Sequence, residues 1–359
     1  MTLLVSAQAA HGPSFQRPEP TKVEVAPGVY VFMTAPYGDV GLDGNSVVVV
    51  GQSAVLVFDS NGTPAAASAV LAEIRRLTSV PVRYLVQSHW HWDHWYGAEV
   101  YRRAFADVQV IAHEKTRTMM MGPALDFNKP GLERGLPGYL KLLDARVAEA
   151  EASRPAPANL AALREQRDEA RFFLEQKTSV THTFPNATFT DRKTVDLGGR
   201  TVEILNHGRA VTPGDAFLYL TAEKVLVTGD LLVNPISFAL SSYPSEWLAT
   251  LEKLDAMEAS VIVPGHGAPL RDKMLLRATM EAFRVLLREG RAAKAKGLDP
   301  DQAQEAVMPA LAGPMQTITG GDSRLKDAFR TQLVDWYLHR VYDELDGRLT
   351  DAIAPIPAK

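Results

Sequence analysis

The sequence predicts an α/β fold, because two observations along its 359 residues agree. Short apolar strand patterns alternate with helical patterns from residue 23 to residue 112, and a second strand-rich block lies between residues 201 and 263. The composition, with 46% hydrophobic and 22% charged residues, is that of an ordinary globular protein. The length allows one large domain or two modest ones.

The first block follows a lead-in, residues 1–22, which is Pro-rich and polar from residue 11 onwards. The block has the pattern strand, turn, strand over residues 23–59. Residues 63–77 have helical periodicity, with Thr63 as the N-cap and a proline at the first helical position. Residues 82–87 form a continuous apolar strand pattern that runs directly into a cluster of histidines. A further helix and strand complete this block.

Residues 114–180 interrupt the alternation and predict a helical insertion. Residues 139–152 and 160–176 are rich in Ala, Leu, Arg and Glu, with apolar residues three and four positions apart, and a Pro-rich turn separates them. We therefore expect an antiparallel helical hairpin. Its role is open: a lid that adds flexible apolar contacts through the methionines of residues 119–121, a contact with a second copy of the chain, or a peripheral bundle.

The second block predicts four strands, at residues 201–205, 216–220, 224–227 and 260–263. One helix is expected between the last two of them, at residues 245–257. From residue 270 onwards the pattern is mostly helical. These patterns predict an α/β domain over residues 23–270, which carries the insertion, and a helical extension over residues 271–359. Within the extension, residues 327–345 form an amphipathic helix that docks either on the core or on a partner.

Composition excludes several classes of protein. The chain has no cysteine, which excludes disulfides, thiol nucleophiles, sulfur-ligated zinc and iron–sulfur clusters. A net charge of -4 offers no broad basic surface, so we expect no nucleic-acid partner. No apolar run is long enough to span a bilayer. Residues 1–10 resemble the end of a secretory signal without its basic start, which favours an exported, periplasmic protein over a cytoplasmic one; a frayed terminus is the alternative.

Three of the nine histidines fall within residues 89–94, in the pattern His-Trp-His-Trp-Asp-His. Alternate residues at the end of a strand can face one point, so His89 and His91 are expected to face the same metal ion. As the chain bends into a helix, Asp93 and His94 turn to a neighbouring point. Two ions held a few Å apart need this layout, whereas a cluster of merely hydrogen-bonded histidines seldom has this spacing.

Two further candidates follow predicted strands. Asp230 stands in Val-Thr-Gly-Asp, where a carboxylate can bridge two metals through its two oxygens, and His266 stands in Pro-Gly-His-Gly, where glycines let the backbone approach an ion closely. Each residue alone fits an ordinary turn or loop. Together with the cluster, both become expected metal ligands.

These residues resemble the motifs of the metallo-β-lactamase superfamily, in its order and roughly its spacing. The matching segments are His-x-His-x-Asp-His at 89–94, Thr-Pro-Gly-Asp at 212–215, Thr-Gly-Asp at 228–230 and Pro-Gly-His-Gly at 264–267, within a stretch from residue 23 to residue 270. The resemblance implies an αββα sandwich with two metal ions at one edge, between two sheets.

The resemblance also implies a role for each candidate. His89 and His91 would hold metal 1, Asp93, His94 and His266 would hold metal 2, and Asp230 would bridge the two. Asp59, at the end of a strand, matches the carboxylate that orients the ligand loop without binding metal, although a simple turn former fits it too.

The sequence departs from the family at one point. The family motif Gly-x-x-His-Thr-Pro-Gly-Asp carries the third imidazole of metal 1, and this chain has Val211 at that position. Valine cannot coordinate a metal. His207, four residues upstream, lies more than ~10 Å away if the segment is extended, so only a looped backbone brings it to the site.

The expected activity is zinc-dependent hydrolysis, in which a hydroxide held by the ions attacks a carbonyl or similar electrophile and Asp93 orients it and relays its proton. With Val211 in place of the imidazole, metal site 1 is weakened or vacant, and iron or manganese becomes an alternative to zinc. A second hypothesis is a one-metal protein that uses Asp93, His94, Asp230 and His266. A third is a degenerate member of the family that binds a ligand or partner without efficient turnover.

The substrate is the least constrained part of this prediction. A small ester, lactone, amide or β-lactam-like molecule fits the expected chemistry, and Trp90, Trp92, Trp95 and Tyr96 either wall an apolar pocket or pack around the ligand loop. We expect the partner to be a small-molecule substrate and expect no membrane span. We also expect that copies of the chain contact one another through the helical segments.

Overall fold

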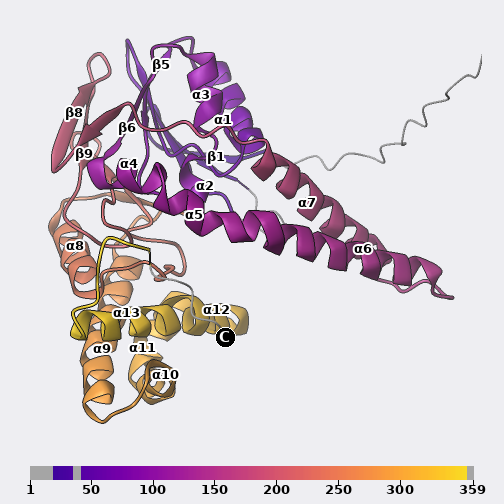
Figure 1. Ribbon diagram of the computed structural model, residues 1–359. Coiled ribbons are helices and arrows are strands. Elements are labelled where there is room, and N and C mark those ends of the chain that lie inside the picture. The colour runs from indigo at the N-terminus through magenta and orange to yellow at the C-terminus, as the bar shows by residue number, and fades with distance from the viewer. Residues whose placement is uncertain (1–18, 35–41, 354–359) are drawn as a thin grey trace, which may run out of the picture.

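The computed structural model describes residues 19–34 and 42–353. The signal-like residues 1–10 and most of the lead-in lie outside them. Among the described residues, no helix is long and apolar enough to cross a membrane. Two β-sheets form the centre of the molecule, with helices on the outer face of each (Figure 1).

The first sheet has seven strands in chain order. They are β1 (Thr21–Ala26), β2 (Val29–Met33), β3 (Ser46–Val50), β4 (Val55–Phe58), β5 (Val82–Val86), β6 (Gln109–His113) and β7 (Ala187–Phe189). Strands β1 to β4 pair antiparallel, and β4 to β7 pair parallel. The parallel part aligns the carboxyl ends of β4 and β5, from which Asp59 and the histidine cluster follow.

The second sheet has five strands in the order β12-β11-β10-β9-β8. They are β8 (Arg192–Asp196), β9 (Thr201–Leu205), β10 (Phe217–Leu220), β11 (Val225–Gly229) and β12 (Val261–Pro264). Only β11 and β12 pair parallel, so Asp230 and the loop to His266 leave the sheet at the same edge. The short strands β7 and β8 had no expected counterpart in the sequence, because β8 is largely polar and β7 has only three residues.

The core has the layers of an αββα sandwich. Side chains that alternate along the strands divide between two clusters: Val47 and Val49 pack between the sheets, whereas Val48 packs under the outer helices of the first sheet. Those helices are α1 (Pro64–Leu77) and α3 (Ala98–Ala104). The predicted start of α1 is confirmed, since the Thr63 side chain caps it by accepting a hydrogen bond from the Ala66 N–H at 3.3 Å.

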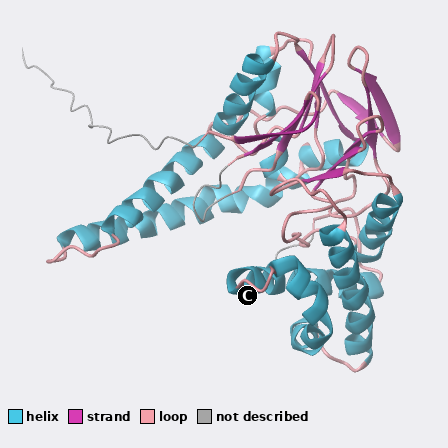
Figure 2. Cartoon of the chain, turned by 180° about the vertical axis from the view of Figure 1, so that it is seen from behind, coloured by secondary structure: helices cyan, strands magenta, loops and turns pink. Residues whose placement is uncertain are grey.

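The predicted helical insertion is present and begins directly after β6. It consists of α4 (Glu114–Met120), α5 (Pro123–Pro130), a π-helical turn η1 (Gly131–Gly135), α6 (Leu136–Ala152) and α7 (Leu160–Thr178). Helices α6 and α7 lie side by side and project together away from the sheets (Figures 1 and 2). The base of α7 returns to the body beside α2 (Trp92–Trp95), the short helix of the histidine cluster.

A bundle of helices lies against the outer face of the second sheet. Its elements are α8 (Pro244–Ala256), α9 (Met274–Ala295), α10 (Pro300–Val307), η2 (Met308–Leu311), α11 (Ala312–Thr319), α12 (Ser323–Ala328), the π-helical turn η3 (Phe329–Val334) and α13 (Asp335–Leu345). Helices α10, α11 and α13 pack on α9 rather than on the strands (Figure 1). The helical extension is packed on the core, through contacts such as that of Phe283 on α9 with Trp247 on α8, whose ring centroids are 4.7 Å apart.

The expected single helix over residues 327–345 is wrong in its start and its regularity. The helical run begins at Ser323, because Asp322 accepts hydrogen bonds from the N–H groups of Arg324 and Leu325. The π-turn η3 then widens the run, and Phe329, Leu333 and Val334 are all buried.

Candidate metal centre

The site lies where the carboxyl ends of two parallel strand pairs meet. From the first sheet, β4 ends before Asp59 and β5 ends before residues 88–94; from the second, β11 ends before Asp230 and β12 before His266. The backbone joins the two sheets here, since the Ala216 N–H donates to the Ser88 carbonyl at 2.7 Å. The sandwich thus brings side chains from far apart in the sequence to one edge.

The six residues expected to bind metal form two groups. The first contains His89, His91 and Asp230, and the second contains Asp93, His94 and His266; in each group one donor atom per residue lies within 4.8 Å of the others. His91 is the N-cap residue of α2, with extended backbone, so the chain turns from strand to helix between the two groups.

Asp230 faces both groups. Its Oδ2 lies 3.7 Å from His89 Nε2, and its Oδ1 lies 3.3 Å from His94 Nε2 and 3.5 Å from His266 Nε2. In the second group, Asp93 Oδ2 lies 3.0 Å from His266 Nε2 and 3.3 Å from His94 Nε2. One oxygen of Asp230 thus faces each group, so its carboxylate would contact an ion held in either group.

Buried donor atoms without hydrogen bonds test whether these residues suit a metal. Within the described part of the chain, His89 Nε2, His94 Nε2 and Asp230 Oδ1 are buried and make no hydrogen bond of acceptable geometry. Unsatisfied buried polar atoms are rare and costly, and three of them belong to these two adjacent groups. Imidazole nitrogens and carboxylate oxygens are ligands that zinc, iron and manganese accept, so the donor set fits divalent metal ions.

Asp59 orients the ring of His94 and, through Ser88, the ring of His89. Its Oδ2 lies 2.8 Å from His94 Nδ1, and it accepts from the Ser88 N–H and hydroxyl, both at 2.7 Å. The Ser88 hydroxyl in turn lies 2.9 Å from His89 Nδ1. Both rings thus point their Nε2 atoms into the site. The sequence indicated Asp59 but gave no signal for Ser88.

Ser241 supports His91 in the same way. Its hydroxyl lies 3.2 Å from His91 Nε2 and donates to the Val211 carbonyl at 2.9 Å, which leaves His91 Nδ1 for a metal. Sequence reasoning missed Ser241, because it lies 150 residues from His91 in an irregular loop without a motif. The backbone carbonyl of Val211 therefore contacts His91 through Ser241, although the Val211 side chain has no atom that can bind a metal.

Burial and charge set the protonation of the two groups. Burial lowers the pKa of His91 to about 4 and holds the pKa of His89 well below its ordinary value. Both rings are thus neutral near pH 7, the form that binds metal. Burial acts to raise the pKa of Asp93, but His94 and His266 outweigh it and hold that pKa well below its usual range. The same two imidazoles lower the pKa of Asp230, so both carboxylates are ionised.

Gly265 allows β12 to approach the site closely. A Cβ at this position would lie 2.0 Å from Asp230 Oδ1, so no other residue fits without displacing the carboxylate or the strand end. This is the close approach that the Pro-Gly-His-Gly segment predicts.

The Val211 segment forms a tight turn closed by Asp215. The buried Asp215 carboxylate accepts from the N–H and the hydroxyl of Thr212, both at 2.9 Å, and burial raises its pKa to about 7. Val211 itself is buried in the apolar cluster under the C-terminal helices. His207 lies against the ring of Phe217 and is in neither group of candidate ligands.

The remaining described histidines lie elsewhere. His113 caps α4 by accepting from the Lys115 N–H, His182 stacks on Phe184, and His339 contacts Asp335 one turn away on α13. His11 lies outside the described residues.

A family model described as the metallo-beta-lactamase superfamily matches residues 39–266, more than half of the chain. The chain belongs to this superfamily. The expected αββα fold with a helical insertion and a helical extension is confirmed.

One curated relative has a described activity. The chain is 26% identical over 282 residues to a linear primary-alkylsulfatase from Pseudomonas sp. (strain ATCC 19151), a match that covers 72% of this chain and 49% of the relative. The chain therefore spans about half the length of that curated relative.

Two solved structures share the fold. A metallo-beta-lactamase from Pontibacter korlensis matches with a TM-score of 0.52 and 18% identity, over 74% of this chain and 99% of that one. A double mutant of the sec-alkyl sulfatase PisA1 matches with a TM-score of 0.60 and 18% identity, over 94% of this chain and 52% of that one. The second match extends over more of this superfamily member, including its helical extension.

Proposed function

We propose that this protein hydrolyses small esters with two divalent metal ions, held by His89, His91 and Asp230 on one side and by Asp93, His94 and His266 on the other. The observation that carries the proposal is the pair of donor groups that share Asp230, with three buried donor atoms left without hydrogen bonds. Zinc is the expected ion, with iron or manganese as alternatives.

Each group of residues has a separate task in this proposal. Bound ions would lower the pKa of a water molecule towards 7 and polarise the bond that is cleaved. Asp59 and Ser88 hold the rings of His94 and His89 in place, so ligand geometry is set before substrate arrives. Asp93 is the candidate for orienting the attacking water and accepting its proton, because its side chain keeps 13% exposure beside His266.

Val211 makes the two metal positions unequal. The first group offers two imidazoles and one carboxylate oxygen, whereas the second offers two imidazoles and Asp93 besides the shared carboxylate. We infer that the first position binds its ion more weakly. In the alternative, only the second position is filled, and the protein binds a ligand or partner with little turnover.

The proposed substrate is the sulfate ester of an alkyl alcohol. The similarity to an alkylsulfatase supports the sulfate group of this substrate. Aromatic side chains beside the site support its alkyl group. Phe238 is 37% exposed; its ring centroid lies 6.4 Å from that of His91 and 6.5 Å from that of Trp336 on α13. The helical extension thus adds an aromatic side chain near the metal centre, where an alkyl chain can be sheltered from water.

Turnover assays test the proposal. Zinc-loaded protein is incubated with decyl sulfate, a simple aryl acetate, a lactone and a chromogenic β-lactam, and the released products are quantified. We expect sulfate release from decyl sulfate, lowered by at least ~100-fold in Asp93→Asn and unchanged in the matched control His339→Gln on α13.

Each outcome of these assays is informative. Hydrolysis of the acetate, lactone or β-lactam without sulfate release would contradict the substrate and leave the hydrolase class intact. No turnover of any compound by protein that holds two ions would favour the binding protein over the enzyme.

A further inference from the structure

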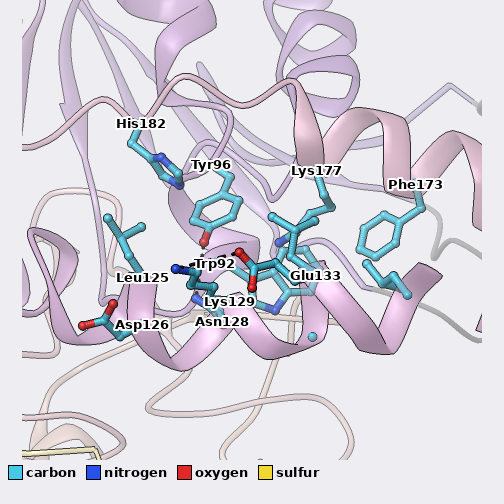
Figure 3. A pocket seen from close by; sticks show the side chains of 13 residues that line it. Trp92, Tyr96, Leu125, Asp126, Asn128, Lys129, Glu133, Phe173, Lys177 and His182 are labelled. Atoms are coloured by element: carbon cyan, nitrogen blue, oxygen red, sulfur yellow. Dashed lines mark hydrogen bonds and ion pairs between the residues drawn. The ribbon is translucent and has the colours of Figure 1, made fainter. Parts of the chain in front are cut away.

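A second cavity lies beside the metal centre, between α2, the α5–η1 segment and the base of α7. It has a volume of about 470 Å³, which is within the range of ~300–1,000 Å³ typical of small-molecule sites. None of the six candidate metal ligands lines it. Figure 3 shows its aromatic walls, Trp92 and Tyr96 from the histidine-cluster loop and Phe173 from α7.

Lys177 places a buried amine in this cavity. The residue is 7% exposed, and its Nζ lies 3.5 Å from the centroid of the Trp92 ring and 4.1 Å from that of Tyr96. Within residues 19–34 and 42–353, no hydrogen bond and no ion pair reaches this nitrogen; its contacts are with ring faces. An ammonium taken out of water usually has a carboxylate or carbonyl partner, because desolvation of a charge is costly.

The charges around the amine leave it without a neutralising partner. Burial holds the pKa of Lys177 well below its ordinary value, and the charges of Asp93 and Asp43 only partly oppose that effect. Lys129 and Glu133 also line the cavity, but they pair with each other at 3.8 Å and both are exposed, and Asp126 lines it on the same side. Among the described residues, none of these carboxylates makes an ion pair with Lys177, whose amine faces the aromatic walls.

We propose that this cavity binds an amphipathic organic anion, with the anionic group at Lys177 Nζ and the apolar body against Trp92, Tyr96 and Phe173. An anionic oxygen would supply the missing hydrogen-bond acceptor, and the ring faces would shelter a flat or chain-like body. The proposal goes beyond the hydrolysis proposed for the metal centre and does not depend on it.

The cavity is adjacent to the metal loop, since Trp92 lies between His91 and Asp93 in the sequence and on the short helix α2. A ligand packed on Trp92 would contact the same loop that carries the candidate metal ligands. The two sites are nevertheless separate, because the ligand would rest on α5, η1 and α7 on its other sides.

A pair of fluorescent probes with matched bodies tests the role of the anion. Anilinonaphthalene sulfonate has a sulfonate on a naphthylamine body, and N-phenylnaphthylamine has the same body without it. We expect wild-type protein to bind the sulfonate at least ~10-fold more tightly than the neutral probe, since a hydrogen bond to a charged group contributes that much or more. Equal affinities would overturn the proposal without any variant.

Variants then locate the anion. Lys177→Met removes the amine with little change in volume, and we expect it to bring the sulfonate's affinity down to that of the neutral probe. Lys141→Met, an exposed lysine on α6 that does not line the cavity, is the matched control and should bind within about twofold of wild type, because exposed charges are screened. Equal losses in both variants, or none in Lys177→Met, would contradict the assignment.

Competition separates this site from the metal centre. Octane sulfonate, which has no ester bond to hydrolyse, should displace the fluorescent sulfonate, whereas inorganic sulfate at the same concentration should not. Displacement should persist after the metals are removed with a chelator. Failure of binding in metal-free protein would assign the probe to the metal centre and overturn the proposal, while leaving the proposed hydrolysis untouched.

Discussion

The contact between Asp59 and the two ligand imidazoles leads to the most specific prediction. In Asp59→Asn the side chain keeps its shape, but only one of its two terminal atoms can accept. The NH2 group then faces either the Ser88 N–H, or His94 and the Ser88 hydroxyl, all of which are donors to Asp59. Asparagine also tolerates the left-handed backbone at this position, where φ is 60°, so the variant should fold. The change therefore acts on ligand orientation rather than on the backbone.

The size of the effect follows from these contacts. Asp59 touches His94 directly and His89 only through Ser88, so the second metal position should lose more affinity than the first. Loss of a partner that orients a metal ligand typically weakens metal binding by about 10–100-fold, or about 1.4–2.8 kcal/mol. We expect a loss in this range for zinc at the second position and a smaller one at the first.

Zinc competition with a chromophoric chelator measures both affinities, and circular dichroism checks the fold. The matched control is Asp196→Asn, an exposed carboxylate at the end of β8 that accepts a hydrogen bond from the Gly198 N–H and lies in neither group of candidate ligands. Wild-type zinc affinity in Asp59→Asn, or an equal loss in the control, would refute the reasoning.

Two further predictions concern the segment around Val211. Ser241→Ala removes the contact to His91 Nε2 and should weaken the first metal position by up to about tenfold, as measured in the same zinc competition, with the second position unaffected; a loss confined to the second position would contradict this. The folded-state pKa of Asp215, about 7, lies above its unfolded value, so its protonated form favours the native state at low pH. As pH rises from about 4 to about 7, this group should remove up to about 4 kcal/mol of stability. Denaturant unfolding of metal-free protein should therefore show a steeper fall with pH in wild type than in Asp215→Asn, and parallel curves would count against the buried carboxyl.

The sequence was sufficient for the fold wherever local patterns decide the structure. The start of α1 follows from the cap residue Thr63, and the alternation of Val47, Val48 and Val49 matches the two faces of the first sheet. Strand β8 could not be predicted in the same way, because its polar residues form a strand only by pairing with β9. The π-turn before α13 likewise depends on tertiary packing.

The candidate site, too, was predictable only where the local sequence carries a motif. The histidine cluster was evident because His, Asp and spacing together carry the chemistry, and the structure brings Asp230 and His266 to it from the second sheet. Ser241 could not be foreseen, since a serine in an irregular loop has no pattern that relates it to His91. The burial of Lys177 could not be predicted either, because a lysine in a charged amphipathic helix is expected at the surface.

Zinc titration followed by elemental analysis tests the central claim most directly, namely two metal positions of unequal strength because Val211 stands where the family has a histidine. We predict two ions per chain, with one bound at least ~10-fold more weakly, and a selective gain at that weaker position in Val211→His together with a higher hydrolytic rate. Two ions bound with equal affinity, or no gain in either metal content or rate in Val211→His, would contradict the account.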